Sequence, residues 1–356
     1  MTDGVVAQLR SRAVGYAPYA PDLRAPGDRR RFAYWAQARG VPFTLARPGE
    51  RFDVVVVSLA ADLSWWRRLP RNAGRVVFDL TDAYLKVPGN EPRALLRGVA
   101  KFAAGRSRYC EPNFRRTLVA MCRRADAVVC TSEEIAADVA LLNPNVHVVL
   151  DFIEDVLDRP KTAYAAGDPF RLVWDGLAEN VGTFQVVASA LEQVHRMRPL
   201  ALDVITSPVA YRWMQRFGRR DTGRVLARTL RVPVRLHPWT SGAVARLAPA
   251  ADAGIIPLPL DDPLRAGKSA NKLVQYWRAG LPVVASATPT HRRVMDEAGV
   301  PMYAGTPAEW VELLTRCVSD EAFRRDGARR GRAYAEREHS EARKLAFWDA
   351  AMASVL

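Results

Sequence analysis

Short runs of consecutive apolar residues alternate along the chain with longer segments of helical periodicity. In the first half the runs are rich in β-branched residues, which is typical of strands buried on both faces of a parallel sheet. They lie at 52–59, 75–80, 127–131 and 146–150. Helical spacing fills the intervals at 29–39, 114–124 and 133–142, the last with Ser132 as its N-cap. This alternation predicts a doubly wound α/β sheet.

A second series of the same kind begins after a proline-containing linker at 151–169. Its strands are expected at 170–174, 200–206, 234–237, 253–258 and 282–286. The length of 356 residues also fits two domains. A final helix continues through 345–356 and is long enough to return to the first domain. We therefore expect domains at 1–165 and 166–340, and a C-terminal helix at 341–356 that packs toward the first domain.

Positive charge is concentrated in one segment of this basic chain, whose formal net charge is +14. Ten Lys and Arg residues lie between Lys86 and Arg124, against Glu91 and Glu111. The segment is either a solvated helical face or a contact for an anionic surface such as lipid headgroups. No helix-turn-helix, zinc-finger or aromatic RNA-binding signature accompanies the charge, so no nucleic-acid partner is expected.

The chain has no run of about 18 apolar residues and no secretory signal pattern. We expect a cytoplasmic protein, either free or peripheral at the inner face of the membrane. The four cysteines lack metal-ligand spacing and the density of a disulfide framework, so they are expected to be reduced and mostly packed. No Asp-x-Asp motif or His cluster indicates a metal site, and we expect neither a metal nor a cofactor.

Candidate chemistry centres on 266–286, where a loop with two lysines opens a helix that ends at Gly280. Lys268, Ser269, Asn271 and Lys272 cluster at the predicted N-terminus of that helix. There the free backbone N–H groups and the helix dipole favour a phosphate, and the ammonium groups add charge-assisted hydrogen bonds. A diphosphate is the natural occupant, and ordinary solvated loop and capping residues are the alternative.

This segment resembles the donor site of the retaining GT-B glycosyltransferases, the family that includes glycogen synthases and phosphatidylinositol mannosyltransferases. There a Lys-containing loop and a helix precede Gly-x-Pro-Val-Val-Ala, which matches 280–285. Residues 125–132, 173–176 and 247–258 resemble further family segments. The resemblance implies two Rossmann-like domains that face each other across a cleft. It also implies an acceptor on the first domain, a nucleotide-sugar on the second, and transfer with retention of configuration.

Two departures from the family pattern concern the donor site. The family's Glu-x7-Glu motif, whose second glutamate binds the donor ribose, has Gly267 and Gln275 at its two positions. Gln275 can still hydrogen-bond a ribose hydroxyl but supplies no negative charge. The glycine loop at Gly176 also lacks the usual basic residue, so the resemblance leaves Lys268 and Lys272 to neutralise the diphosphate.

Other candidate residues follow the predicted strands. Thr206 and Ser207 either face the nucleotide or cap the next helix. Trp239 either stacks on the nucleobase or belongs to the core. On the acceptor side, Asp79 and Asp82 either cap the next turn or orient an acceptor hydroxyl and accept its proton, with Asp82 preferred. Residues 15–18 are expected to form an early loop, and Asp28 is either an N-cap or part of the site.

The proposed activity is transfer of a sugar from a nucleotide-diphosphate sugar to a glycan, lipid-linked or small-molecule acceptor. Lys268 and Lys272 would stabilise the leaving diphosphate. A nucleotide-sugar epimerase is one alternative, although it needs further acid and base residues beside the sugar. A catalytically silent subunit that binds a partner or a membrane is another, and the missing glutamates favour it. A nicotinamide-dependent enzyme is disfavoured because no Gly-x-Gly-x-x-Gly turn follows an early strand.

Overall fold

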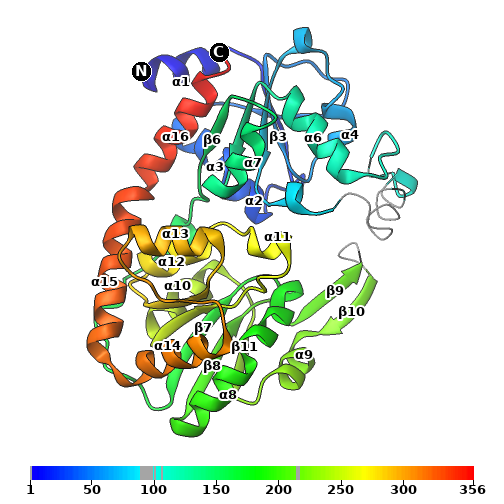
Figure 1. Cartoon of the computed structure of the whole chain (residues 1–356). Helices are drawn as coiled ribbons and strands as arrows, with labels where there is room; N and C mark the ends of the chain where they lie inside the picture. The colour runs from blue at the N-terminus through cyan, green and yellow to red at the C-terminus, as the bar shows by residue number, and fades with distance from the viewer. Residues whose placement is uncertain (1, 89–98, 100–101, 106, 214–216) are drawn as a thin grey trace. The chain divides into compact units, whose positions relative to one another are not determined.

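The computed structural model describes residues 2–88, 99, 102–105, 107–213 and 217–356 of the chain. The chain divides into two compact units, each with its own sheet (Figure 1). The first unit comprises Met1–Phe152, Gly267–Ser269 and Glu341–Leu356, and the second Ile153–Ala266 and Ala270–Ser340. The assignment of 1–165 to acceptor binding and of 166–340 to donor binding remains a prediction.

The first unit contains a parallel sheet of six strands in the order β2-β1-β3-β4-β5-β6. The strands are β1 (Val14–Ala17), β2 (Thr44–Leu45), β3 (Val54–Ser58), β4 (Arg75–Leu80), β5 (Ala127–Cys130) and β6 (Val146–Val148). Every residue of β3 and β5 is buried, as the continuous apolar runs predicted. The four strands expected in this half are therefore confirmed.

The expected loop at 15–18 is wrong, because these residues mostly belong to strand β1 (Val14–Ala17). A Cβ atom on Gly15 would lie 2.7 Å from Cγ of Phe52, so this glycine serves close packing rather than a turn. Tyr16 is fully buried, and its hydroxyl donates to Asp28 Oδ1 at 2.7 Å. Asp28 also accepts from the backbone N–H groups of Tyr19 and Ala20, so its carboxylate holds the turn after β1 and is not an N-cap.

Helices cover the first sheet. They are α1 (Thr2–Arg10), α2 (Pro26–Arg29), α3 (Phe32–Arg39), α4 (Leu63–Trp66), α6 (Phe114–Arg124), α7 (Glu133–Ala140) and α16 (Glu341–Ala353), with 3-10 turns η1 (Arg71–Ala73) and η2 (Tyr84–Lys86). Ser132 caps α7 by accepting from the N–H of Ile135, as predicted. The C-terminal helix returns to this unit, where Asp349 of α16 accepts from the indole N–H of Trp35 at 2.8 Å.

The second unit contains another parallel sheet of six strands, in the order β11-β8-β7-β12-β13-β14. The strands are β7 (Phe170–Asp175), β8 (Leu200–Ile205), β11 (Val234–His237), β12 (Ala253–Ile256), β13 (Val283–Ser286) and β14 (Tyr303–Ala304). Five of them were predicted. The strand order reverses between β7 and β12, and ligands of such sheets bind beyond the carboxyl ends of the strands at this switch point.

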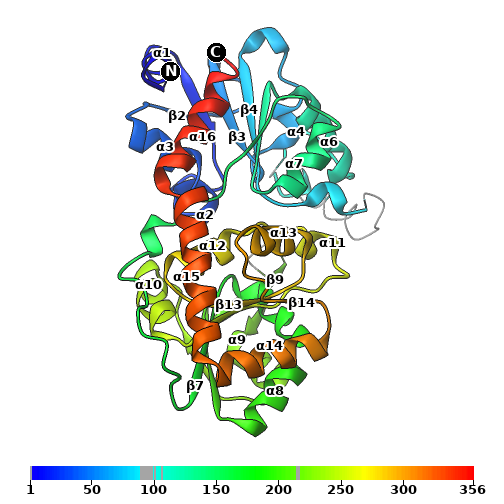
Figure 2. The same cartoon turned by 60° about the vertical axis from the view of Figure 1, so that its left-hand side comes forward.

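Helices also cover the second sheet (Figure 2). They are α8 (Ala188–Met197), α9 (Thr222–Thr229), α10 (Ser241–Ala250), α11 (Pro263–Ala266), α12 (Asn271–Arg278), α13 (Pro289–Glu297), α14 (Pro307–Ser319) and α15 (Glu321–Glu338), with η3 (Glu154–Val156) and η4 (Ala178–Val186). Helix α15 packs closely on α12, because Gly331 faces the indole of Trp277. In the part of the chain that the structure describes, no helix is long and apolar enough to cross a membrane.

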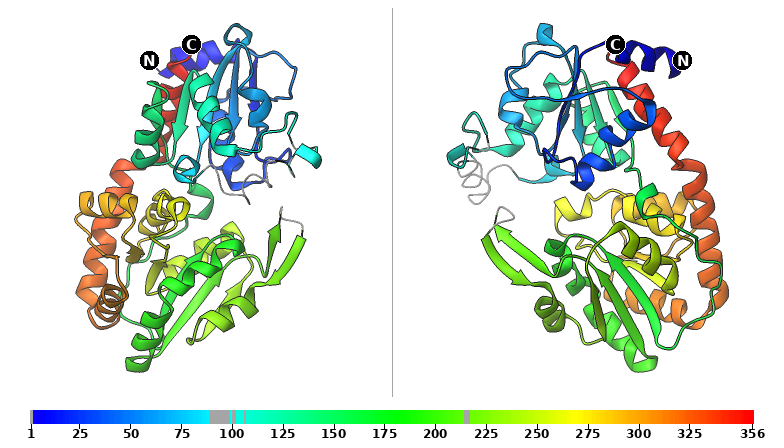
Figure 3. Two further views of the ribbon diagram at one scale, coloured as in Figure 1. Left: turned by 45° about the vertical axis from the view of Figure 1, so that its right-hand side comes forward. Right: turned by 180° about the vertical axis from the view of Figure 1, so that it is seen from behind.

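An antiparallel hairpin interrupts the second unit between β8 and α9. It consists of β9 (Val209–Trp213) and β10 (Phe217–Asp221), and it stands away from the six-stranded sheet (Figure 3). This hairpin was not predicted from the sequence, because its charged residues mask the alternation typical of a strand. Its second strand leads directly into α9.

Candidate functional site

The carboxyl edge of the second sheet gathers several predicted donor residues. Asp175, Ile205 and His237 are the last residues of β7, β8 and β11, and they are paired across the sheet in one row. Gly176 follows β7, and its N–H donates to the carbonyl of Ile205 at 3.1 Å. The edge therefore places the glycine loop beside the residues that follow β8.

Lys272 reaches this edge from the first turn of α12. Its ammonium group lies 4.3 Å from the ring centroid of Trp174 and donates to the carbonyl oxygen of Asp175. A cation over an indole face is held by the ring quadrupole, more strongly where water is excluded. Trp174 is only 2% exposed and packs on Phe184 at a centroid distance of 5.3 Å, so the platform under the ammonium is rigid.

Asp175 is the centre of a second group of contacts. Its Oδ1 accepts from Nε2 of Gln275 at 3.2 Å, and its N–H donates to the hydroxyl of Tyr276 at 2.8 Å. Burial raises the pKa of Tyr276 well above its ordinary value, so its hydroxyl stays neutral. Gln275 is 4% exposed. Its neighbour Asp175 brings a carboxylate that was not among the candidate residues predicted from the sequence.

Gly176 leaves no room for a side chain. A Cβ atom there would lie 2.8 Å from Cη2 and Cζ2 of Trp174 and 3.1 Å from Nζ of Lys272. The absence of a side chain therefore allows the indole and the ammonium to approach the turn after β7, as expected where backbone must come close to a ligand.

Thr206 and Ser207 have different environments. Thr206 is fully buried, its N–H donates to the carbonyl of His237 at 2.9 Å, and its Oγ1 has no hydrogen-bond partner among the described residues. An unpaired buried hydroxyl costs free energy and calls for an explanation. Ser207 instead donates to the carbonyl of Val209 at 2.8 Å and is exposed, so its hydroxyl holds the turn into β9.

The remaining donor candidates lie near helix starts. Ser269 and Asn271 flank Ala270, which precedes α12 and provides no side-chain cap. Trp239 follows β11 by two residues and is half-buried, directly before Thr240, which caps α10. The roles of Ser269, Asn271 and Trp239 in donor binding remain predictions.

The two acceptor candidates in the first unit differ in accessibility. Asp79 is fully buried, and both of its oxygens accept from Nε of Arg31 at 2.8 Å. Burial raises the pKa of Asp79, while Arg31 opposes that rise. Asp82 is about a third exposed, and its Oδ1 lies 2.8 Å from Nζ of Lys268, which groups with the first unit. Only Asp82 has a carboxylate that solvent reaches, so the geometry favours it over Asp79.

Sequence reasoning missed three residues of this arrangement: Trp174, Asp175 and Tyr276. A partial signal was present, because Lys272 and Tyr276 are four residues apart on one helix face. Trp174 and Asp175 end a predicted strand just before the glycine loop, which also marks them as neighbours of the site. Their contacts with Lys272 and Gln275 depend on how α12 packs on β7.

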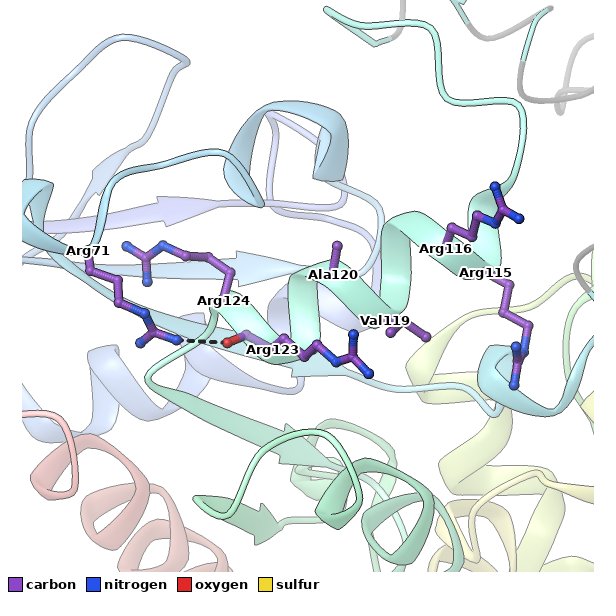
Figure 4. A pocket seen from close by; sticks show the side chains of 7 residues that line it. All are labelled: Arg71, Arg115, Arg116, Val119, Ala120, Arg123 and Arg124. Atoms are coloured by element: carbon purple, nitrogen blue, oxygen red, sulfur yellow. Dashed lines mark hydrogen bonds between the residues drawn. The ribbon is translucent and has the colours of Figure 1, made fainter.

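Four arginines of the basic segment line a surface groove on α6. The groove encloses about 550 Å³ and is lined by Arg71, Arg115, Arg116, Val119, Ala120, Arg123 and Arg124 (Figure 4). Arg93, Arg97, Lys101, Arg106 and Glu91 of the same segment lie outside the described residues. We call this surface the α6 groove.

Few carboxylates neutralise the positive charge of the arginines that line the α6 groove. Arg124 is buried and bonded to Asp126 at 3.1 Å and to backbone carbonyls, and Arg71 donates to the carbonyl of Arg123 at 2.9 Å (Figure 4). Arg116 and Arg123 are exposed and form no ion pair with any described residue. The groove therefore retains an uncompensated positive charge.

No protein-family model matches the sequence, and no curated protein matches it. Solved structures do resemble it at low identity. HepE of Anabaena, in a structure titled as a complex with UDP and glucose, aligns with a TM-score of 0.64 and 14% identity over 99% of this chain and 94% of that chain. Sucrose-phosphate synthase from Thermosynechococcus elongatus aligns with a TM-score of 0.56 and 15% identity, over 88% of this chain and 74% of that chain.

TarM aligns with a TM-score of 0.58 and 7% identity over 84% of this chain, which spans only 54% of the TarM chain. Together these likenesses establish the fold: each unit is a Rossmann-like domain, as in proteins with the two-domain GT-B fold. The expected fold class is thereby confirmed.

Proposed function

We propose that this protein is a glycosyltransferase that takes its sugar from a nucleotide-diphosphate donor bound at the carboxyl edge of the second sheet. The observation that carries the proposal is that Lys272 lies against Gly176 directly after β7, at the strand-order switch point. Thr206, with its unpartnered hydroxyl, follows the neighbouring strand β8. This is where doubly wound sheets bind nucleotides. The UDP in the HepE complex makes uridine diphosphate the first donor nucleotide to test.

Each residue has a defined task in this proposal. Lys272 provides the positive charge that stabilises the departing diphosphate, and Trp174 and the Asp175 carbonyl fix its ammonium beforehand. Such preorganisation favours the transition state because no reorientation is needed as charge develops. Thr206 is also assigned to the nucleotide: its buried hydroxyl must become accessible when the donor binds, and a hydrogen bond to the donor then removes the cost of its unpaired state.

Asp175 replaces the missing glutamate of the family pattern. The helix carries Gln275 where a ribose-binding glutamate is expected, but the amide of Gln275 donates to Asp175, which brings a carboxylate to the same place. The Asp175 carboxylate also has a side-chain hydrogen bond with Tyr276, and since its two oxygens offer about four acceptor positions, it can accept from a ribose hydroxyl as well. Asp175→Asn should then weaken UDP binding more than binding of inorganic diphosphate, which has no ribose.

Asp82 is the residue that we assign to the acceptor, which we propose is a glycan or a lipid-linked sugar. Its exposed carboxylate can orient an acceptor hydroxyl and accept its proton. Asp82→Asn should lower kcat while leaving UDP affinity unchanged. We further propose that the anomeric configuration is retained, which proton NMR of the first product tests directly.

We also propose that the protein works at the inner face of a membrane, with the α6 groove against anionic headgroups. The support is the exposed, unpaired charge of Arg116 and Arg123, since each basic residue near such a surface contributes about 1 kcal/mol. Arg116→Ala/Arg123→Ala should reduce co-sedimentation with phosphatidylglycerol vesicles. As a control, Arg325→Ala/Arg329→Ala removes two arginines that already pair with carboxylates on α15. Equal loss of vesicle binding in both double variants would contradict the assignment of the α6 groove to the membrane contact.

Donor hydrolysis separates this function from that of a silent binding subunit. One feature supports the silent alternative. Where the family pattern has a basic residue in the glycine loop, this chain has the carboxylate of Asp175 directly before Gly176. The test is release of UDP from UDP-glucose and related donors, with and without an acceptor mixture. Slow release that Lys272→Ala abolishes supports the transferase, whereas UDP binding with no release under any condition supports the silent subunit.

A further inference from the structure

The face of α9 carries a second arginine cluster, separate from the donor site and from the α6 groove. Residues 217–235 contain six arginines and one acidic residue, Asp221. Three of these arginines border a groove of about 480 Å³, here called the α9 groove. Its lining consists of Arg220, Asp221, Arg224, Val225, Arg228 and Thr229.

The positive charge of the α9 groove is not neutralised within the protein. Arg220, Arg224 and Arg228 are exposed, and none of them forms an ion pair with any residue that the structure describes. Asp221 is engaged as the N-cap of α9, where its Oδ1 accepts from the N–H of Arg224 at 2.7 Å. Like charges four residues apart destabilise a helix, so this arrangement has a cost that an anionic ligand would relieve.

Helix α15 shows how the same chain treats arginines on an ordinary solvated face. Arg325 pairs with Glu321 at 3.2 Å, Arg329 with Asp326 at 3.1 Å, and Arg332 with Glu336 at 2.7 Å. Each partner lies three or four residues away on the same helix. The absence of such partners on α9 therefore distinguishes it from a face that only needs to be soluble.

We propose that the α9 groove binds an acidic polysaccharide through its carboxylate, phosphate or sulfate groups. Arg224 and Arg228 are separated by about 6 Å along the helix axis, comparable to one sugar unit of an extended chain. Arg220 ends β10 immediately before the helix. A guanidinium fork matches a planar oxyanion bidentately, which a lysine does not.

An acidic glycan suits this surface better than a lipid bilayer. Helix α9 is described throughout, and no large apolar side chain on it is exposed to insert among acyl chains. The inference rests on the proposed function in one respect: the acidic polysaccharide would be the acceptor or its growing product, held at a distance from the transfer site. Binding itself does not require transfer.

Calorimetry of the full chain with polygalacturonate, and with neutral dextran as the comparison, tests this inference. The test variant is R220A/R224A/R228A, and R220K/R224K/R228K keeps the charge but removes the forks. The matched control, R325A/R329A/R332A, removes three charges from the paired face of α15. Titration of UDP into each variant, and co-sedimentation with phosphatidylglycerol vesicles, are measured in parallel.

We expect saturable, salt-sensitive binding of polygalacturonate and none of dextran. The alanine variant of α9 should bind at least about tenfold more weakly, the lysine variant should be intermediate, and the α15 control should match wild type. Unchanged binding in the alanine variant, or equal loss in the α15 control, overturns the proposal. So does vesicle binding that depends on the α9 arginines, or tighter α9-dependent binding of single-stranded nucleic acid.

The UDP titration keeps this inference separate from the proposed function. If neither wild type nor any variant binds UDP, the donor site is refuted, and the polygalacturonate result still stands. If wild type binds UDP but does not bind polygalacturonate, only the α9 inference is refuted.

Discussion

Gly176→Ala tests whether the glycine loop, Trp174 and Lys272 form one nucleotide site. The added methyl group would lie 2.8 Å from the indole of Trp174 and 3.1 Å from the ammonium of Lys272. The ammonium can move, but the indole is buried against Phe184 and cannot rotate away freely. Overpacking of this kind costs about 1–3 kcal/mol of unfolding free energy. The same displacement moves the ammonium from its position for the diphosphate, so UDP affinity should fall at least about tenfold, or about 1.4 kcal/mol.

Gly182→Ala is the matched control for this substitution. Gly182 lies in the neighbouring turn η4, and a Cβ atom there would meet no atom within 4 Å. Where the backbone conformation permits alanine, this exchange stabilises by about 0.4–1 kcal/mol. Urea unfolding gives the stability of both variants, and calorimetry with UDP gives the affinity. If the two variants lose UDP affinity equally, or if Gly176→Ala keeps wild-type affinity, the close approach at Gly176 is not part of a nucleotide site.

Three further predictions concern buried groups. Arg31→Ala should lower the unfolding free energy by about 3–5 kcal/mol in urea unfolding, because it leaves Asp79 buried without a counter-charge; wild-type stability would contradict this role. Thr206→Val should leave the unliganded protein within about 1 kcal/mol of wild type but reduce the melting-temperature gain from UDP. A large loss without UDP would show that the hydroxyl has a structural partner. Finally, Cys110 is exposed, whereas burial raises the pKa of Cys122 and of Cys317 to about 12 and that of Cys130 still further. Mass spectrometry after brief alkylation in mildly alkaline buffer should therefore find Cys110 alone modified, and modification of a second cysteine would contradict the packing.

Buried parallel strands were the part of the fold that sequence reasoning predicted best. Strand β4 has the predicted limits, Arg75–Leu80, because a continuous apolar run between polar turns permits few other arrangements. Strand β1 was missed because Gly15 and Pro18 are typical turn residues, whereas Gly15 in fact accommodates the ring of Phe52. A local pattern does not reveal a close approach between residues 37 positions apart in the chain.

Whether the candidate residues form a nucleotide site remains a prediction, and the sequence indicated only part of the contacts among them. Lys272 was identified from its place at a helix start, and the structure puts it beside the glycine loop as expected from the topology. The cation–π contact with Trp174 and the pairing of Gln275 with Asp175 depend on how α12 packs on β7. Likewise, the partner of buried Asp79 is Arg31, which is 48 residues away in the chain and carries no local sequence signal.

The central claim is that a nucleotide diphosphate binds at the carboxyl edge of the second sheet with Lys272 as its cationic partner. Calorimetric titration of UDP into wild type, Lys272→Ala and the control Lys161→Ala tests it most directly, because Lys161 belongs to the same unit but lies outside this edge. The account predicts saturable binding by wild type and Lys161→Ala, and at least about tenfold weaker binding by Lys272→Ala. Equal UDP affinity in all three proteins, or no binding of UDP or of any other nucleoside diphosphate by wild type, would contradict it.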